Sequence, residues 1–404
     1  MSTVHPTVPP TASHRPQPAS TPLPLGFSCH IANIGIKDST DDFVVVAADT
    51  RCSAAGMFTK SRFAGPSVVV SREHVADHTA RAVVVISKNA NVATGEQGLA
   101  NAREVVAGVA GAIGCDADDV LIASTGVIGR QYPMDRVRAG LESLTAPFAG
   151  RDALAVATGI MTTDTVAKVA SAPIPGSDAV VVGVAKGVGM IEPDMATMIT
   201  VMFTDADVDP DALDQMFRAV IDRTFNCVSI DTDTSTSDTA IVLASGVAGP
   251  VENGSLVQAL FEVALSLTKQ VARDGEGAEK LIEVDVRGGA DPTQAKRIAK
   301  AIVNSPLVKT AVHGADPNWG RVAMAIGKCS DDTDIDERDV VIRFGDQECY
   351  PTRVDDAGLA ALSEYLRSDE VEINVSLGIA DGAATVWGCD LTDGYIRINA
   401  DYTT

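Results

Sequence analysis

The chain has 404 residues, 46% of them hydrophobic, which is enough to bury a large core and predicts two or three lobes. Its 32 Lys and Arg against 54 Asp and Glu give a formal net charge of -22, which argues against nucleic acid and anionic membranes as partners. No apolar run approaches the roughly 18–20 residues that span a bilayer.

Residues 1–26 are rich in Pro, Ser and Thr and lack the apolar core of a secretory signal, so we expect a flexible tail. Beyond it, Val- and Ile-rich runs predict strands at 43–48, 67–70, 82–86, 120–123, 179–184, 198–204, 240–244, 281–286, 340–344, 371–377 and 384–389. Amphipathic periodicity and capping residues predict helices at 96–112, 133–144, 210–226, 255–273, 292–303 and 356–367. This mixture predicts an α/β protein in which helices cover apolar sheet faces.

The sequence carries no strong signal for a metal or a common cofactor. His74 and His78 have the i, i+4 spacing of a helical metal pair, but a surface helix is the preferred interpretation. The seven cysteines are scattered and never spaced as Cys-x-x-Cys, which indicates reduced thiols in a cytoplasmic protein. Neither a phosphate-binding P-loop nor a dinucleotide-binding Gly-x-Gly-x-x-Gly occurs. We therefore expect no metal and no cofactor.

The most informative segment is residues 185–200, Ala-Lys-Gly-Val-Gly-Met-Ile-Glu-Pro-Asp-Met-Ala-Thr-Met-Ile-Thr. Pro193 fixes a turn ahead of Ala196 and Thr197, and an apolar strand begins directly afterwards. A small residue before Thr at such a junction suits an N-to-O acyl shift, in which the Thr hydroxyl attacks the preceding carbonyl and water releases the ester. The new N-terminal Thr would carry its own amine as general base. Composition alone favours the plainer interpretation, a Gly-rich loop followed by an edge strand.

A second segment, residues 123–129 (Ala-Ser-Thr-Gly-Val-Ile-Gly), directly follows an apolar strand. Thr125 and Gly126 at a strand end can direct a hydroxyl and a backbone N–H at one point, as an oxyanion requires. Taken by itself, the segment is more typical of an ordinary glycine turn.

Together these segments resemble those of the ornithine acetyltransferases, also called glutamate N-acetyltransferases, from about Gly26 to the end of the chain. The matching blocks follow the family's order: 124–129, 160–164 (Ile-Met-Thr-Thr-Asp), 185–198, 274–277 (Asp-Gly-Glu-Gly), 305–311 (Ser-Pro-Leu-Val-Lys-Thr-Ala), 314–321 (Gly-Ala-Asp-Pro-Asn-Trp-Gly-Arg) and 395–404. Many blocks in order make the resemblance specific, although each block alone is weak. It implies a layered α/β sandwich of the N-terminal-nucleophile-like type with a smaller C-terminal lobe.

The resemblance also implies how the chain is divided and which residues act. Cleavage between Ala196 and Thr197 would give an α chain that ends at Ala196 and a β chain of 197–404. Without the tail of residues 1–26, the α chain covers 27–196. Thr197 would be the nucleophile, and Thr125 and Gly126 would form the oxyanion hole. The implied substrate contacts are Thr162, Lys186, Thr197, Glu276, Asn399 and Thr404. N-acetylornithine carries a carboxylate and an ammonium group, so its site needs a cation such as Lys186 and an anion such as Glu276.

Three segments depart from the common family pattern: 61–69 (Ser-Arg-Phe-Ala-Gly-Pro-Ser-Val-Val), 86–95 (Ile-Ser-Lys-Asn-Ala-Asn-Val-Ala-Thr-Gly) and 235–238 (Ser-Thr-Ser-Asp, where Ser-Thr-Asn-Asp is usual). These variants are similar to those of the ornithine acetyltransferases associated with clavulanic acid gene clusters. They leave the implied nucleophile and oxyanion hole unchanged. A role in arginine biosynthesis and a role in a specialised β-lactam pathway therefore both stay open.

The activity that the resemblance implies is acetyl transfer from N2-acetyl-L-ornithine to L-glutamate through an acetyl-Thr197 ester, an exchange that requires no CoA. The α and β chains are expected to pair into a heterotetramer of two α and two β chains. Two alternatives stay open at this point. One is a self-cleaving amidase or aminopeptidase with water as the acceptor, and the other is a non-catalytic ligand-binding relative that stays uncut.

Overall fold

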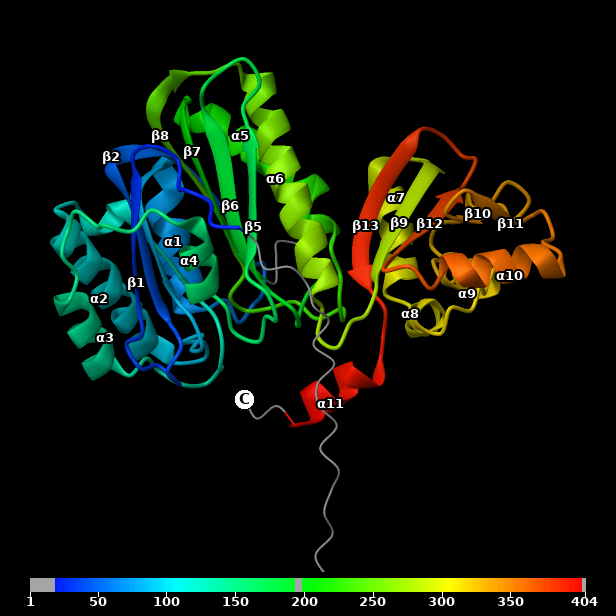
Figure 1. The fold of residues 1–404 in the computed structure, drawn as a ribbon, viewed down its shortest axis with the longest axis horizontal. Helices are drawn as coiled ribbons and strands as arrows, with labels where there is room; N and C mark the ends of the chain where they lie inside the picture. Colours follow the sequence, from blue (N-terminus) through cyan, green and yellow to red (C-terminus); the bar gives the residue numbers. More distant parts are fainter. Residues whose placement is uncertain (1–18, 193–197, 402–404) are drawn as a thin grey trace, which may run out of the picture.

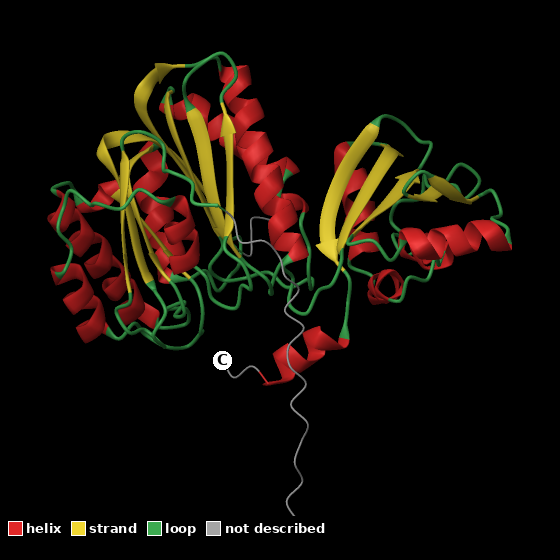
Figure 2. Ribbon diagram, in the orientation of Figure 1, coloured by secondary structure: helices red, strands yellow, loops and turns green. Residues whose placement is uncertain are grey.

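A computed structural model describes residues 19–192 and 198–401 and shows two β-sheets covered by helices (Figures 1 and 2). Within these residues the larger sheet has eight strands, and the smaller sheet, in the C-terminal lobe, has five. The α/β class and the smaller C-terminal lobe that the sequence predicted are therefore confirmed.

The strands are β1 (Phe27–Ala32), β2 (Phe43–Phe58), β3 (Thr79–Ile86), β4 (Val120–Ser124), β5 (Lys168–Pro173), β6 (Val180–Lys186), β7 (Ile199–Asp207), β8 (Thr239–Pro250), β9 (Leu281–Gly289), β10 (Val341–Phe344), β11 (Gln347–Tyr350), β12 (Glu370–Ser376) and β13 (Gly382–Cys389). The α-helices are α1 (Pro66–His74), α2 (Gly95–Ile113), α3 (Met134–Glu142), α4 (Ala153–Gly159), α5 (Pro210–Arg223), α6 (Asn253–Arg273), α7 (Pro292–Val303), α8 (Pro306–His313), α9 (Trp319–Gly327), α10 (Asp356–Tyr365) and α11 (Asp393–Asp401). Among these described segments, no helix is long and apolar enough to cross a membrane.

The larger sheet runs in the order β4-β3-β2-β8-β7-β6-β5, with β1 added beside β2. The long strand β2 pairs with β1 and β3 mainly through its first half and with β8 through its second half. The two halves of the sheet share one apolar core, in which the rings of Phe27 and Phe203 lie with centroids 5.2 Å apart. Because strand side chains alternate, the other residues of each strand face α2 and α3 on one outer side and α5 and α6 on the other, which gives a layered sandwich (Figure 1).

The predicted strand at 67–70 is wrong, because these residues belong to helix α1. Pro66 starts the helix directly after Gly65, as proline commonly does. Ser71 Oγ donates to Ile122 O at 2.7 Å and accepts from Ile122 N at 2.6 Å, which holds the helix against β4. The valines are apolar because the helix is buried, and a run this short does not distinguish a buried helix from a strand.

The expected surface helix that carries both His74 and His78 is also wrong. Helix α1 ends at His74, and His78 follows a short 3-10 turn with a left-handed backbone (φ 58°). The two rings face different partners: His74 Nδ1 lies 2.8 Å from Val120 O, and His78 Nδ1 lies 2.7 Å from Asp211 Oδ1.

The smaller sheet runs in the order β11-β10-β12-β9-β13. Helix α7 packs on β9 and β13, and α6 of the larger lobe contacts the same two strands, so the lobes share one continuous core. After β13 the chain enters α11, which lies beneath the junction of the lobes in Figure 1. This junction borders the edge of the larger sheet where β4 and β6 end and where β7 and β8 begin.

Candidate active site

All described residues that the sequence predicted as site residues line one cavity of about 200 Å³. It lies at the sheet edge where β4 and β6 end and where β7 and β8 begin. Its walls include Thr125, Gly126, Thr162, Lys186, Glu276 and Asn399. The other predicted site residues lie outside the described residues: Ala196, Thr197 and Thr404.

Thr125 and Gly126 leave the end of β4 in a conformation that requires glycine at the second position. Gly126 has a φ of +128°, and a Cβ on it would stand 2.2 Å from the carbonyl carbon of Lys88. Thr125 N donates to Ile86 O at 3.1 Å, which keeps the segment beside the end of β3. The Thr125 hydroxyl and the backbone after it are thus fixed at the cavity wall, as an oxyanion hole requires.

Lys186, the last residue of β6, is the cation of the cavity. Its Nζ donates to Thr125 Oγ1 at 3.2 Å, so the predicted substrate-binding cation contacts a predicted oxyanion donor. Burial lowers the pKa of the Lys186 ammonium, whereas the nearby carboxyl of Asp164 favours its charged form. A buried ammonium of this kind is stabilised by an anionic ligand such as a carboxylate.

Glu276 is the anion of the cavity and is held by side chains from two other segments. Thr163 Oγ1 donates to Glu276 Oε1 at 3.3 Å, and Asn399 Nδ2 of α11 donates to Oε2 at 2.9 Å. Thr162, the predicted contact, lines the same cavity, but its neighbour Thr163 is the residue that bonds to Glu276. The sequence did not single out Thr163, because two consecutive threonines give no indication of which hydroxyl faces the site.

A buried lysine, Lys168, is paired with two aspartates next to the cavity. Lys168 Nζ lies 2.7 Å from Asp164 Oδ1 and 2.6 Å from Asp274 Oδ2, and the three side chains are at most 1% exposed. Asp164 Oδ1 also accepts from Gly187 N at 2.7 Å, which fixes the backbone that follows Lys186. Burial acts to raise the pKa of Asp164, but the two lysines hold it at about 2. Sequence reasoning missed this network, although Asp164 and Asp274 lie in family-like blocks.

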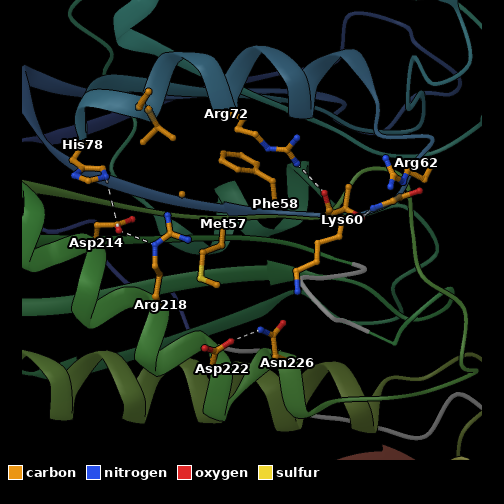
Figure 3. A pocket seen from close by; sticks show the side chains of 15 residues that line it. Met57, Phe58, Lys60, Arg62, Arg72, His78, Asp214, Arg218, Asp222 and Asn226 are labelled. Atoms are coloured by element: carbon orange, nitrogen blue, oxygen red, sulfur yellow. Dashed lines mark hydrogen bonds and ion pairs between the residues drawn. The ribbon is translucent and has the colours of Figure 1, made fainter.

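A larger cavity of about 810 Å³ lies between α1, β2 and α5 and contains none of the predicted site residues (Figure 3). Several of its charged side chains are paired with groups of the chain itself. Arg218 Nε donates to Asp214 Oδ2 at 2.7 Å, and His78 Nε2 lies 3.8 Å from the same oxygen. Arg72 donates to Thr59 O at 2.9 Å. The smaller cavity is therefore the candidate active site.

Among the described residues, one group brings three possible metal-ligand atoms together: Glu279, His313 and Asp390. Asp390 Oδ1 accepts from the backbone N of Glu279 and of Lys280 at 2.9 Å each, so this carboxylate holds the chain that precedes β9. The group lies outside the candidate cavity, and we interpret it as a structural group that stabilises the fold.

Comparison with known proteins identifies the family. The ArgJ family model matches residues 28–404. Glutamate N-acetyltransferase Oat2 of Streptomyces clavuligerus is 58% identical over 392 residues, which cover 95% of this chain and 99% of that protein. Arginine biosynthesis bifunctional protein ArgJ 2 of Nostoc sp. is 54% identical over 381 residues, which cover 94% and 98% respectively.

Two solved structures are also similar to parts of the chain. Arginine biosynthesis bifunctional protein ArgJ from Bacillus halodurans is 40% identical with a TM-score of 0.46, covering 49% of this chain and 96% of that chain. Ornithine acetyltransferase from Mycobacterium tuberculosis, complexed with ornithine, is 29% identical with a TM-score of 0.39, covering 44% and 94% respectively.

The layered α/β fold and the small cavity, which holds one buried cation and one anion, define an enzyme that acts on a small charged molecule. The chain belongs to the ArgJ family. The resemblance to ornithine acetyltransferases that the motifs indicated is thereby confirmed, and so is the enzyme class, an acyltransferase.

Proposed function

We propose that this chain transfers the acetyl group of N2-acetyl-L-ornithine to L-glutamate, as a step of arginine biosynthesis, after cutting itself between Ala196 and Thr197. The observation that carries the proposal is the contact of Lys186 Nζ with Thr125 Oγ1 at 3.2 Å, in a cavity that Glu276 also lines. A cation for a carboxylate, an anion for an ammonium and a donor for an oxyanion are thus available within one small volume.

The exchange has two halves. Thr197 Oγ attacks the acetyl carbonyl of N2-acetyl-L-ornithine, and the α-amine of Thr197 takes the hydroxyl proton. Thr125 and Gly126 stabilise the oxyanion, the carbon–nitrogen bond breaks, and the departing ornithine amine takes the proton. The α-amine of glutamate then attacks the acetyl ester, which releases N-acetylglutamate and restores the Thr197 hydroxyl.

Substrate recognition follows from the charges of the cavity. Lys186 binds the α-carboxylate that N-acetylornithine and glutamate have in common, which orients the reacting nitrogen toward Thr125 and Thr197. Glu276 binds the side-chain ammonium of ornithine, with Asn399 and Thr163 holding its carboxylate in place. Thr162 and Thr404 complete the set of substrate contacts.

The domain organisation is part of the same proposal. Residues 27–196 belong to the α chain and 197–404 form the β chain, with two copies of each in a cytoplasmic heterotetramer. Of the segment 1–26 that the sequence assigned to a tail, Leu23 is buried in the core of the larger lobe, and its backbone N donates to Arg151 O at 2.8 Å. The substrates are small molecules, and neither nucleic acid nor a membrane is a partner, in keeping with the net charge of -22. No metal or cofactor takes part.

The test is whether glutamate accelerates the release of ornithine from N2-acetyl-L-ornithine. Acceleration, with formation of N-acetylglutamate in equal amount, supports the acetyltransferase. Release at the same rate with and without glutamate indicates a self-cleaving amidase that uses water. An uncut chain of 41.9 kDa without release of ornithine indicates the non-catalytic alternative.

A further inference from the structure

The backbone that forms the proposed oxyanion hole is fixed on both sides of Gly126. Thr125 N donates to Ile86 O at 3.1 Å, and Val127 N donates to Lys88 O at 3.4 Å. Between them, Gly126 N donates to no group of the described residues. The two flanking hydrogen bonds therefore set the direction of an unpaired N–H at the cavity wall, which is what an oxyanion donor needs.

The segment that accepts these bonds is 86–95, one of those that depart from the common family pattern, and it packs tightly against the turn. A Cβ on Gly126 would stand 2.2 Å from the carbonyl carbon of Lys88. Ala90 N donates in return to Val127 O at 3.0 Å, which adds a short parallel bridge. A shift of the Lys88 peptide must therefore displace Gly126 and Val127.

Lys88 has a backbone conformation that a residue with a side chain rarely adopts. Its φ is +73°, in the left-handed region that favours glycine. A side chain there brings Cβ close to the following carbonyl oxygen, so the conformation persists only where the surrounding structure holds it. The direction of the Lys88 carbonyl, and with it the bond from Val127, therefore depends on what holds Lys88.

The Lys88 side chain is the group that holds this backbone. It is 6% exposed, and its Nζ donates to Asp38 Oδ1 and to Thr40 O at 2.8 Å each. Thr40 Oγ1 accepts the third proton of the ammonium. The hydrogen bonds from Lys88 and Thr40 keep the pKa of the Asp38 carboxyl well below its ordinary value, so the ion pair is present at neutral pH. All three protons of the Lys88 ammonium are thus bonded within the chain.

We infer that Lys88 is a positioning residue for the oxyanion hole: its ammonium holds the left-handed backbone beside Gly126 and so sets the direction of the Gly126 N–H. Lys88 is not among the residues that line the cavity, so it acts through Val127 and Gly126. The inference rests on the proposed function, which assigns the oxyanion hole to Thr125 and Gly126, and adds the residue that keeps their backbone in place.

The test compares Lys88→Met with Lys88→Gly in the acetyl-transfer assay. Methionine nearly keeps the length of the side chain but has no charge to hold the left-handed backbone, so the N–H of Gly126 loses its direction. We expect kcat to fall at least about tenfold with KM within about twofold, because the oxyanion forms only in the transition state. Glycine adopts the same φ without strain and should recover at least about half of the wild-type kcat.

Arg103→Met is the matched control, because Arg103 also forms an ion pair, with Glu73 at 2.9 Å, but at the exposed surface of α2. It should leave kcat and KM unchanged. A wild-type kcat in Lys88→Met would overturn the inference. Equal losses of kcat in Lys88→Met and Lys88→Gly would overturn it too, because the backbone conformation would then not be what matters. A raised KM with unchanged kcat would indicate a role in binding and likewise count against it.

If Lys88→Met does not fold, Asp38→Lys takes its place. The Asp38 side chain is half exposed, so a lysine there reaches solvent, and its charge repels the Lys88 ammonium. A lower kcat with unchanged KM supports the inference, and a wild-type kcat overturns it.

Amide hydrogen exchange tests the same geometry without a substrate. In Lys88→Met the amides of Ala90 and Val127 should exchange at least about tenfold faster relative to those at the centre of β3, and Lys88→Gly should keep most of their protection. Unchanged exchange in Lys88→Met contradicts the inference. Wild-type protein that transfers no acetyl group refutes the proposed function, and the exchange experiment then decides the role of Lys88 by itself.

Discussion

Gly189 lies directly against the carboxylate of Glu276: a Cβ on residue 189 would stand 2.5 Å from Oε2 and 3.0 Å from Oε1. The anion of the cavity occupies its place because residue 189 has no side chain. The glycine-rich segment before the proposed cleavage site therefore shapes the substrate pocket as well as the backbone.

Gly189→Ala should weaken the binding of N-acetylornithine, because the methyl group displaces the Glu276 carboxylate from its hydrogen bonds. Hydrogen bonds to a charged group are worth about 1.5–3 kcal/mol. The KM for N-acetylornithine should rise roughly ten- to hundredfold, with a smaller change in kcat. Steady-state kinetics measure this effect. Gly111→Ala, where a Cβ meets open space in helix α2, is the control and should leave KM unchanged.

Thr125→Val should lower kcat by roughly 10²–10³-fold, the scale observed when an oxyanion-hole donor is lost. Valine keeps the branched shape that packs at the end of β4 but removes the hydroxyl. The variant is purified and, if it is cut, assayed with both substrates. Thr125→Ser retains the hydroxyl and should keep most of the activity. Equal losses in the Val and Ser variants would mean that packing, and not the hydroxyl, matters at this position.

The buried ion pairs of Lys168 with Asp164 and Asp274 should make the stability of the protein depend on pH in the acidic range. The folded-state pKa of Asp164 is about 2, below the ordinary value near 3.9, so its contribution is full above about pH 4 and is lost as the pH falls toward 2. Asp164→Asn should therefore show a shallower fall of Tm between pH 4 and pH 2 than the wild type. Parallel Tm curves for the two proteins would contradict this account.

Lys168→Met tests the same ion pairs by removing their positive charge. Removing the lysine leaves Asp164 and Asp274 buried without their shared partner, and breaking such a pair typically costs about 3–5 kcal/mol. We expect a marked fall in Tm at neutral pH. Lys269→Met, in a more exposed ion pair with Glu283, should change Tm far less, because surface pairs contribute about 0–1 kcal/mol.

Local patterns predicted much of the fold. The helix expected at 292–303 is observed with these bounds, because Asp291 caps it and Pro292 starts it. The prediction of a strand at 67–70 was wrong because valines are equally compatible with a buried helix. Short elements such as β1 and α4 went unnoticed, since each is stabilised by packing between the halves of the sheet, which no local pattern records.

The site was predictable where it coincides with ordered family-like blocks, as at Thr125, Lys186 and Glu276. Thr163 also lies in such a block, but nothing in the sequence distinguished it from Thr162. Asp238, which lines the same cavity, stands in the segment 235–238, which departs from the family pattern. Whether Thr162 or Thr163 bonds to Glu276 depends on the turn that follows α4. The burial of Asp238 depends on the pairing of β7 with β8, which joins segments about forty residues apart.

The most direct test of the central claim is the intact mass of the two fragments after incubation with N2-acetyl-L-ornithine in the absence of glutamate. The account predicts that the fragment beginning at Thr197 gains one acetyl group and that addition of L-glutamate removes it, with formation of N-acetylglutamate. A fragment that transfers acetyl groups in solution but never carries one, under conditions that trap esters, would contradict a covalent Thr197 intermediate.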